Sequence, residues 1–360
     1  MNKLVVCGEF IWPWYQEAAA SALERNGNNV FRFGWFEYLY KWSPDKSEPI
    51  FKSFFHRLAF KFQKGPFINK INKDFIDYID KVKPDTIILY HAILIRPSTI
   101  KHIKKNYKTL IVQYTPDNPF SKKANKLYWK NYINSIHIAD YTTPHRKKNI
   151  VDIKKYGGKI LNDFILMPYF IPEKEYPISQ DKIPKKYICD VVFAGHFEND
   201  NRVECIESLL KSGYKVNLFG GGWNEAAGFL SKMSPIHDLL PTEPVVGKDY
   251  LYALNGAKIC LCFYSKLNED SYTTRVFQIP ATKSAMFSED SEDIKKILKE
   301  DHEVVIFRNQ DELNSKVRHY LNNPRLLDEI SLNAYKRMFT DEHDISSRMN
   351  KWMVSIDDYR

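Results

Sequence analysis

The chain has 360 residues, of which 44% are hydrophobic and 27% charged, a composition that excludes wholesale disorder and allows two globular domains. It contains no run of about 18 apolar residues, so no transmembrane helix is expected, and the short apolar stretch after Met1 predicts a strand rather than a secretory signal. The net charge of +9 is uneven, because residues 1–180 carry 29 Lys and Arg against 16 Asp and Glu, whereas residues 181–360 carry 24 against 28.

The elements predicted for the first half alternate between strand and helix. A helix is expected over 15–26, and further helical patterns separate the later strands. The strands are expected at 4–8, 29–34, 85–90, 109–114 and 165–169. Almost wholly apolar strands separated by helices indicate a parallel sheet that is covered on both faces.

The same alternation restarts after residues 171–188, a segment with three prolines and little periodicity that predicts a linker. Strands are expected at 189–194, 215–219, 244–246, 258–263 and 304–307, with helices over about 202–212, over 249–254, from about 274, and through most of 311–352. The predicted organisation is an N-terminal domain at 1–175, a linker at 176–188, a C-terminal domain at 189–340, and a final helical segment at 341–360 that packs back toward the first domain.

Residues that directly follow strands matter most, because ligands of parallel α/β sheets bind beyond the carboxyl ends of the strands. In the first half, His91 and Asp117 are the titratable candidates for a catalytic base or for contact with an acceptor hydroxyl. Gly8, Glu9 and Asn118 are candidates for acceptor binding. The alternative is that these are hydrogen-bonded turn residues.

Three segments of the second half follow strands and suit a diphosphate ligand. In 193–202 (FAGHFENDNR) a glycine ends the strand and Arg202 opens a helix, while 219–223 (FGGGW) would expose backbone N–H groups. In 268–281 (NEDSYTTRVFQIPA), Arg275 and Gln278 share one helical face. The donor-binding candidates are Gly195, His196, Arg202, Gly220, Gly221, Trp223, Tyr264, Thr273, Thr274, Arg275 and Gln278. Ordinary strand–helix turns are the alternative, and Trp223 could stack on a ligand or pack in the core.

The order of these segments resembles the donor-binding half of GT-B glycosyltransferases. The sequences FAGHF…R, LFGGGW, VVGKDYLYALNGAKICLCF and DSYTTRVFQIPA are most similar to the glycosyl transferases group 1 branch that includes CgeB-like spore-maturation proteins. DTIILYHA and IVQYTPDNPF in the first half resemble its strand ends more loosely. The resemblance implies a GT-B fold, with two Rossmann-like doubly wound domains facing a central cleft, and a donor diphosphate neutralised by Arg202 and Arg275.

The chain departs from this family at two acidic positions. The helix glutamate of the family, often a ribose ligand, is Gln278 here, and eight residues earlier Asp270 stands for the usual Glu. Asp270 is therefore a third catalytic candidate. Glutamine binds hydroxyls more weakly than a carboxylate does, so these changes also support the alternative of a non-catalytic module that binds sugar nucleotide or glycan.

The resemblance further implies a hexosyltransferase-type enzyme that transfers a sugar from a nucleotide-sugar donor to a glycan or lipid-linked acceptor, with retention and without a metal or other cofactor. A sugar-nucleotide epimerase or hydrolase on the same fold is the enzymatic alternative. No HExxH motif and no Cys/His set with zinc spacing occurs. A nucleic-acid partner is not expected, because the basic half shows no nucleic-acid motif.

Residues 51–73 raise the question of a membrane surface. An apolar stripe at helical spacing, flanked by Lys and Arg, is formed by Phe51, Phe54, Phe55, Leu58, Ala59 and Phe62. It could lie on an anionic membrane or face the core as an ordinary amphipathic helix.

The five cysteines include no CxxC pair and are predicted to be buried, reduced thiols, so the protein is expected to be cytoplasmic, with the inner membrane face as an optional site of peripheral attachment.

Overall fold

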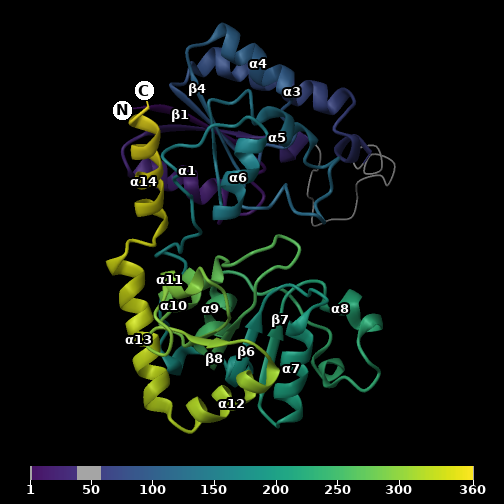
Figure 1. Ribbon diagram of the computed structural model, residues 1–360, viewed down its shortest axis with the longest axis vertical. Helices are drawn as coiled ribbons and strands as arrows, with labels where there is room; N and C mark the ends of the chain where they lie inside the picture. The colour runs from purple at the N-terminus through teal and green to yellow at the C-terminus, as the bar shows by residue number, and fades with distance from the viewer. Residues whose placement is uncertain (1, 39–57, 360) are drawn as a thin grey trace. The chain divides into compact units, whose positions relative to one another are not determined.

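The computed structural model describes residues 2–38 and 58–359 and divides into two compact units. The first unit consists of Met1–Met167 together with Ile345–Arg360, and the second unit is Pro168–Asp344 (Figure 1). Each unit contains a five-stranded, wholly parallel sheet with helices on both faces, which confirms the predicted α/β class. Of the predicted apolar stripe, residues 51–57 lie outside the described residues.

The sheet of the first unit has the strand order β2-β1-β3-β4-β5. Its strands are β1 (Lys3–Gly8), β2 (Asn29–Gly34), β3 (Thr86–Tyr90), β4 (Leu110–Tyr114) and β5 (Tyr141–Thr143). Its helices are α1 (Gln16–Arg25), α3 (Pro66–Val82), α4 (Pro97–Asn106), α5 (Lys130–Ser135), α6 (Lys147–Lys155) and α14 (Ile345–Asp357). The predicted strand at 165–169 is wrong: Leu166 and Tyr169 are buried although this segment has no ladder partner, so its apolar run reflects burial rather than pairing.

Alternate residues of these strands face two different helix layers. Val5, Ile87 and Ile111 belong to one apolar cluster with side chains of α3, α4 and α5. The opposite face is covered in part by α14, whose Trp352 packs its ring 5.5 Å from that of Tyr114. Buried strands therefore carry apolar side chains at nearly every position, as expected for a parallel sheet.

The sheet of the second unit has the strand order β10-β9-β8-β6-β7. Its strands are β6 (Cys189–Ala194), β7 (Val216–Phe219), β8 (Ala257–Cys262), β9 (Met286–Glu289) and β10 (Val305–Phe307). Its helices are α7 (Asn201–Lys211), α8 (Trp223–Ala226), α9 (Lys248–Asn255), α10 (Arg275–Ala281), α11 (Ile294–Ile297), α12 (Gln310–Leu321) and α13 (Pro324–Thr340). The predicted strand at 244–246 is wrong, because this segment lies at the surface, with Val246 55% exposed.

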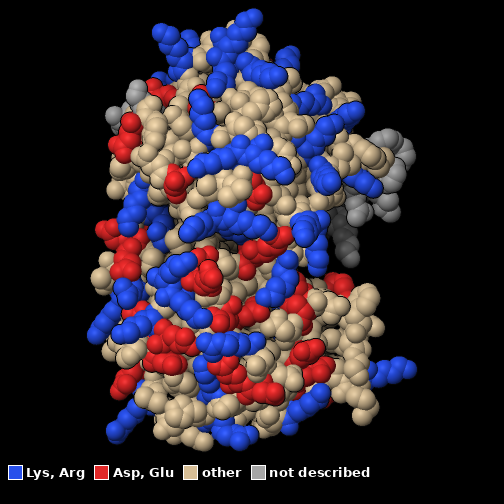
Figure 2. Space-filling model, in the orientation of Figure 1, with Lys and Arg blue, Asp and Glu red and all other residues tan. Residues whose placement is uncertain are grey.

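Charge is distributed differently over the two units. On the face drawn in Figure 2, Lys and Arg predominate over the first unit, whereas both signs mix over the second. All five cysteines are buried and free, as predicted. No helix in the described part of the chain is both long enough and apolar enough to cross a membrane.

Candidate active site

His91 is the centre of a polar cluster at the carboxyl end of β3 in the first unit. Its backbone is in the left-handed region (φ 55°), which non-glycine residues adopt rarely. The imidazole is buried, with Nδ1 2.8 Å from the Thr115 hydroxyl and Nε2 2.9 Å from the Tyr128 hydroxyl. Burial raises the pKa of Tyr128, so its hydroxyl stays protonated. The ring of His91 is therefore fixed by bonds at both nitrogens.

Two carboxylates flank this imidazole. Glu9 Oε1 lies 3.5 Å from His91 Nε2, and Asp117 Oδ2 lies 3.9 Å from Nδ1. Burial raises the pKa of Glu9, His91 opposes this effect, and the charge of Asp117 adds to it. The side chain of Asp117 is 47% exposed, so one carboxylate of the cluster faces solvent. The structure thus brings together three predicted residues in an arrangement that can accept and release protons.

The other two acceptor-site candidates of this unit support the backbone. A Cβ on Gly8 would lie 2.5 Å from the Tyr90 carbonyl oxygen, so only glycine allows β1 to approach β3 at its end. Asn118 is 98% buried, and its Oδ1 accepts hydrogen bonds from the Phe120 N–H and from Asn149 Nδ2. Both residues shape the loops that hold Glu9 and Asp117, and their contact with an acceptor stays a prediction.

In the second unit the glycines of FGGGW allow two loops to touch. A Cβ on Gly220 (φ 140°) would lie 2.0 Å from the Gly195 carbonyl oxygen, a distance that excludes any side chain there. A Cβ on Gly221 would lie 3.0 Å from the His196 ring, whose residue is exposed. The glycines after β6 and β7 are therefore required because the two loop backbones approach each other closely. This role is separate from any contact with a ligand.

Arg275, the first residue of α10, lies directly over the end of β6. A Cβ on Gly195 would be only 3.2 Å from Arg275 Cζ, and the guanidinium lies 5.7 Å from the centre of the Phe193 ring. Its Nε is buried without a hydrogen-bond partner, and no carboxylate of the described residues pairs with it. A half-buried cation with one unused donor and no carboxylate partner among the described residues is suited to an anionic ligand.

Arg202 is placed differently, although the sequence predicts the same role for both arginines. Its side chain is 98% buried, and it donates to both carboxylate oxygens of Asp200 at 2.7 and 2.9 Å. It also donates to the carbonyl oxygens of His196 at 2.7 Å and Tyr264 at 3.2 Å. Arg202 therefore braces the loop after β6 against the end of β8, and a direct contact with diphosphate stays a prediction.

Two aromatic donor-site candidates belong to the core. Trp223 is completely buried against Phe193 and Phe197, and its indole N–H donates to the Gly195 carbonyl oxygen at 3.0 Å. Tyr264 is 1% exposed, with its hydroxyl 2.6 Å from that of Ser288. Neither ring has an exposed face, so of the two alternatives for Trp223 the structure supports packing in the core.

Gln278 is held by two residues that the sequence analysis did not single out. The Tyr250 hydroxyl donates to Gln278 Oε1 at 3.2 Å, and Gln278 Nε2 donates to Glu175 Oε1 at 3.1 Å. Asp270, Thr273 and Thr274 are half-buried near the start of α10. A carboxyl group thus lies beside the position where the resembling family has its helix glutamate, but it comes from residue 175 rather than 278.

Glu175 makes the second unit sensitive to pH. Burial raises its pKa from 4.5 to about 7, against the opposing effect of hydrogen bonds from the Ile171 N–H and Gln278. The folded state holds this proton after the unfolded chain has lost it, so stability falls as pH rises from about 4.5 to about 7, by about 3 kcal/mol in total. We expect Glu175→Gln to remove this fall. Urea unfolding of parent and variant at pH 5 and pH 8 measures it.

The exposed neighbour Glu173 provides the matched control for this prediction. Glu173→Gln should leave the dependence of unfolding free energy on pH like that of the parent. Parallel profiles for the parent and Glu175→Gln would show that Glu175 does not gain its proton on folding.

Some residues of the cluster could not have been found from the sequence. Thr115 stands two positions before Asp117 in the same strand-end segment, and this proximity was a usable signal. Tyr128 and Glu175 follow no strand and carry no motif, so only the fold brings them to His91 and Gln278.

Within residues 2–38 and 58–359, no group of three or more His, Cys, Asp or Glu side chains has the arrangement of a metal site.

Comparison with known proteins agrees with this architecture. Residues 202–354 match the family model described as glycosyl transferase-like. No curated protein sequence matches the chain. Among solved structures, sucrose-phosphate synthase from Thermosynechococcus elongatus has a TM-score of 0.72 at 11% identity, with 100% of both chains covered. HepE from Anabaena in complex with UDP-glucose has a TM-score of 0.68 at 10% identity, with 99% of this chain and 100% of that chain covered.

A glycosyltransferase from Rickettsia africae is similar to the same extent, with a TM-score of 0.67 at 11% identity over 98% of this chain and 97% of that chain. At such low identity these structures establish the fold alone. The glycosyl transferase-like family model matches the segment that carries Arg202, Arg275 and Gln278. The chain therefore has the fold of GT-B glycosyltransferases, and its segment 202–354 is similar to the glycosyl transferase-like family.

Proposed function

We propose that the protein transfers a sugar from a nucleotide-sugar donor to a hydroxyl group of a glycan or lipid-linked acceptor. The second unit holds the donor and the first unit the acceptor. The observation that carries this proposal is Arg275, a half-buried guanidinium over Gly195 with an unused Nε. A diphosphate would pair with this cation. The guanidinium would then compensate the negative charge on the diphosphate as it departs as the leaving group.

The donor is proposed to be a uridine diphosphate sugar, since HepE was solved in complex with UDP-glucose. Gln278, braced by Tyr250 and Glu175, offers amide groups for the hydroxyls of the nucleoside. Asp270, Thr273 and Thr274 precede α10 and complete the proposed donor site. Retention of configuration, independence of metals, a cytoplasmic location and a place in the CgeB-like branch, all implied by the sequence resemblance, belong to the same proposal.

The acceptor is proposed to bind at the His91 cluster. Glu9 lies 3.5 Å from the imidazole, and Asp117 presents a solvent-facing carboxylate beside it. This arrangement can orient an acceptor hydroxyl and accept its proton, or relay that proton to the leaving phosphate.

Nucleotide binding and donor turnover test this function together. We expect calorimetry to show binding of UDP in preference to GDP, CMP and dTDP, and UDP release from a UDP-sugar to depend on an added acceptor. Release without acceptor and with free sugar as product would indicate a hydrolase, and conversion to an isomeric sugar nucleotide an epimerase. Tight UDP binding with no turnover of any UDP-sugar in the presence of acceptor mixtures would support a binding module and contradict the proposed transfer.

A further inference from the structure

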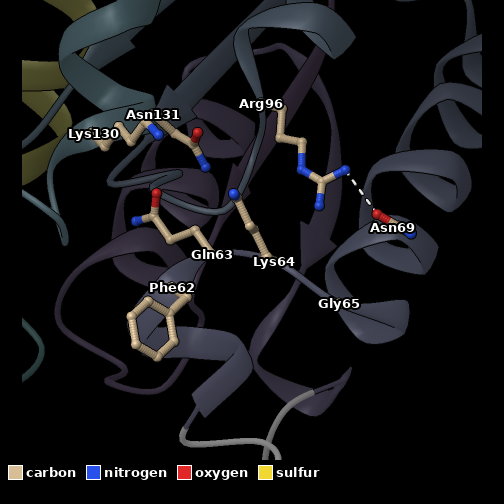
Figure 3. A pocket seen from close by; sticks show the side chains of 8 residues that line it. All are labelled: Phe62, Gln63, Lys64, Gly65, Asn69, Arg96, Lys130 and Asn131. Atoms are coloured by element: carbon tan, nitrogen blue, oxygen red, sulfur yellow. Dashed lines mark hydrogen bonds between the residues drawn. The ribbon is translucent and has the colours of Figure 1, made fainter.

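A cavity of about 400 Å³ in the first unit lies outside the His91 cluster (Figure 3). It is formed where α3, α4 and α5 begin, after the strands β2, β3 and β4, and it includes the turn at 62–65. Neither α3 nor α4 has a side chain that caps its first backbone N–H groups. Its size lies within the range of small-molecule sites, which is roughly 300–1,000 Å³.

The lining of this cavity is strongly basic. Lys64, Arg96 and Lys130 line it, and none of the residues that line it is acidic. Asn69 Oδ1 accepts a hydrogen bond from Arg96 Nη1 at 2.8 Å, which orients the guanidinium beside the cavity (Figure 3). None of the three cations forms an ion pair with a carboxylate in the described part of the chain. Three neighbouring positive charges without acidic partners raise the local potential and favour an anion.

Gln63 adds a polar group that is already removed from water. It is 96% buried, its Nε2 donates to the Tyr128 carbonyl oxygen, and its Oε1 has no hydrogen-bond partner. Asn131, also buried, lies beside it in the lining and donates to the Ile93 carbonyl oxygen at 3.1 Å (Figure 3). A buried acceptor without a donor is costly, and a ligand hydroxyl supplies such a donor.

We propose that this cavity binds a phosphorylated, hydroxyl-bearing molecule, with the phosphoryl group held by Lys64, Arg96 and Lys130 and a hydroxyl donated to Gln63. A phosphoryl dianion matches three cations better than a singly charged carboxylate does. The planar fork of arginine and the point charges of the two lysines are both suited to phosphate oxygens. A volume of about 400 Å³ fits one such group rather than the continuous backbone of a nucleic acid, which needs an extended groove.

The segment 128–131 links this cavity to the His91 cluster. The Tyr128 carbonyl oxygen accepts from Gln63, while the Tyr128 hydroxyl bonds His91, and Trp129 packs its ring 5.1 Å from the imidazole. The inference itself rests on the first unit alone and does not depend on sugar transfer.

Direct binding tests it, with the whole chain in an Arg275→Ala background so that phosphate at the second unit does not contribute. Calorimetric titration would use inorganic phosphate, glycerol 3-phosphate and, as the neutral control, glycerol. We expect glycerol 3-phosphate to bind more tightly than phosphate, and Lys64→Ala combined with Lys130→Ala to weaken it by at least about tenfold. The matched control is Lys101→Ala combined with Lys105→Ala, two exposed lysines of α4, which should change binding by less than about twofold.

Two further experiments test the hydroxyl contact with Gln63 and the source of the ligand separately. Gln63→Asn, chosen because asparagine tolerates the left-handed backbone at this position (φ 51°), should reduce the advantage of glycerol 3-phosphate over phosphate. Sedimentation with phosphatidylcholine vesicles, with and without phosphatidylinositol 4-phosphate, distinguishes the source of the ligand. Pelleting that requires both Lys64 and Lys130 indicates a lipid headgroup, and binding of only the free ester indicates a soluble one. Equal binding by pocket and control variants, or no binding of the phosphate compounds and of the vesicles, would overturn the inference.

Discussion

Replacement of Arg275 by alanine is expected to weaken UDP binding by about a hundredfold while leaving the protein as stable as the parent, or more stable. A charge-assisted hydrogen bond to diphosphate contributes about 1.5–3 kcal/mol, and a half-buried guanidinium falls at the upper end of this range. Stability should not suffer, because Nε of Arg275 has no partner in the folded protein and its burial is unfavourable. Calorimetry with UDP and thermal unfolding, on the same preparations, measure the two effects.

Three comparison variants sharpen this prediction. Arg318→Ala removes an exposed arginine of α12 and should leave UDP affinity unchanged. Arg275→Lys keeps the charge without the planar fork and should give an intermediate affinity. Arg202→Ala should instead destabilise the second unit by about 3–5 kcal/mol, because it leaves the largely buried Asp200 unpaired. Unchanged UDP affinity in Arg275→Ala would refute the proposed donor site.

Replacement of His91 by asparagine should lower kcat/KM for sugar transfer by about a hundredfold or more, with UDP affinity changed by less than twofold. The rate effect follows from loss of the group that would accept or relay the acceptor proton, an effect worth about 10²–10⁴ in catalysis. The affinity should be preserved because the proposed donor site lies wholly in the other unit. Asparagine is suitable since it tolerates the left-handed backbone at this position.

His102→Asn, at an exposed position of α4, is the matched control and should transfer at the parental rate. The readout is the initial rate of UDP release with saturating donor and varied acceptor, together with its pH profile. If His91→Asn folds normally and keeps both the parental rate and the parental pH profile, the His91 cluster has a structural rather than a catalytic role.

The main elements of both sheets could be predicted from the sequence, because a buried parallel strand consists almost wholly of apolar residues. The runs at 189–194 and 29–34 coincide with β6 and β2. The failures have a common cause: short strands carry too little pattern. β5 has three residues, and β9 (MFSE) ends in two polar ones, so neither differs from a turn in composition. Conversely, the buried segment around Leu166 looks like a strand although it pairs with none.

The candidate site was predictable only where a residue follows a strand. This rule placed Glu9, His91 and Asp117 together. Arg275, which was predicted from its helical position and the family resemblance, lies beside the glycine that ends β6. The sequence could not separate Arg275 from Arg202, because the difference lies in partners. Asp200 precedes Arg202 by two residues and accepts hydrogen bonds from its guanidinium, whereas no carboxylate stands at the corresponding position before Arg275. Sequence position identifies which cations reach a site, and the hydrogen-bond network determines which of them remain free to bind a ligand.

The contribution of α14 to the first unit has a consequence for biosynthesis. Trp352 is fully buried there, and its indole N–H donates to the Thr143 hydroxyl at 2.9 Å. The ribosome makes this helix only after residues 168–344, and 177 residues take roughly 10–35 s at about 5–20 residues per second. The nascent first unit must wait through this interval with the surface beneath Trp352 uncovered, whereas the second unit emerges as one continuous segment and can fold at once. Chaperone dependence during translation should therefore concentrate on the half of the protein that is synthesised first.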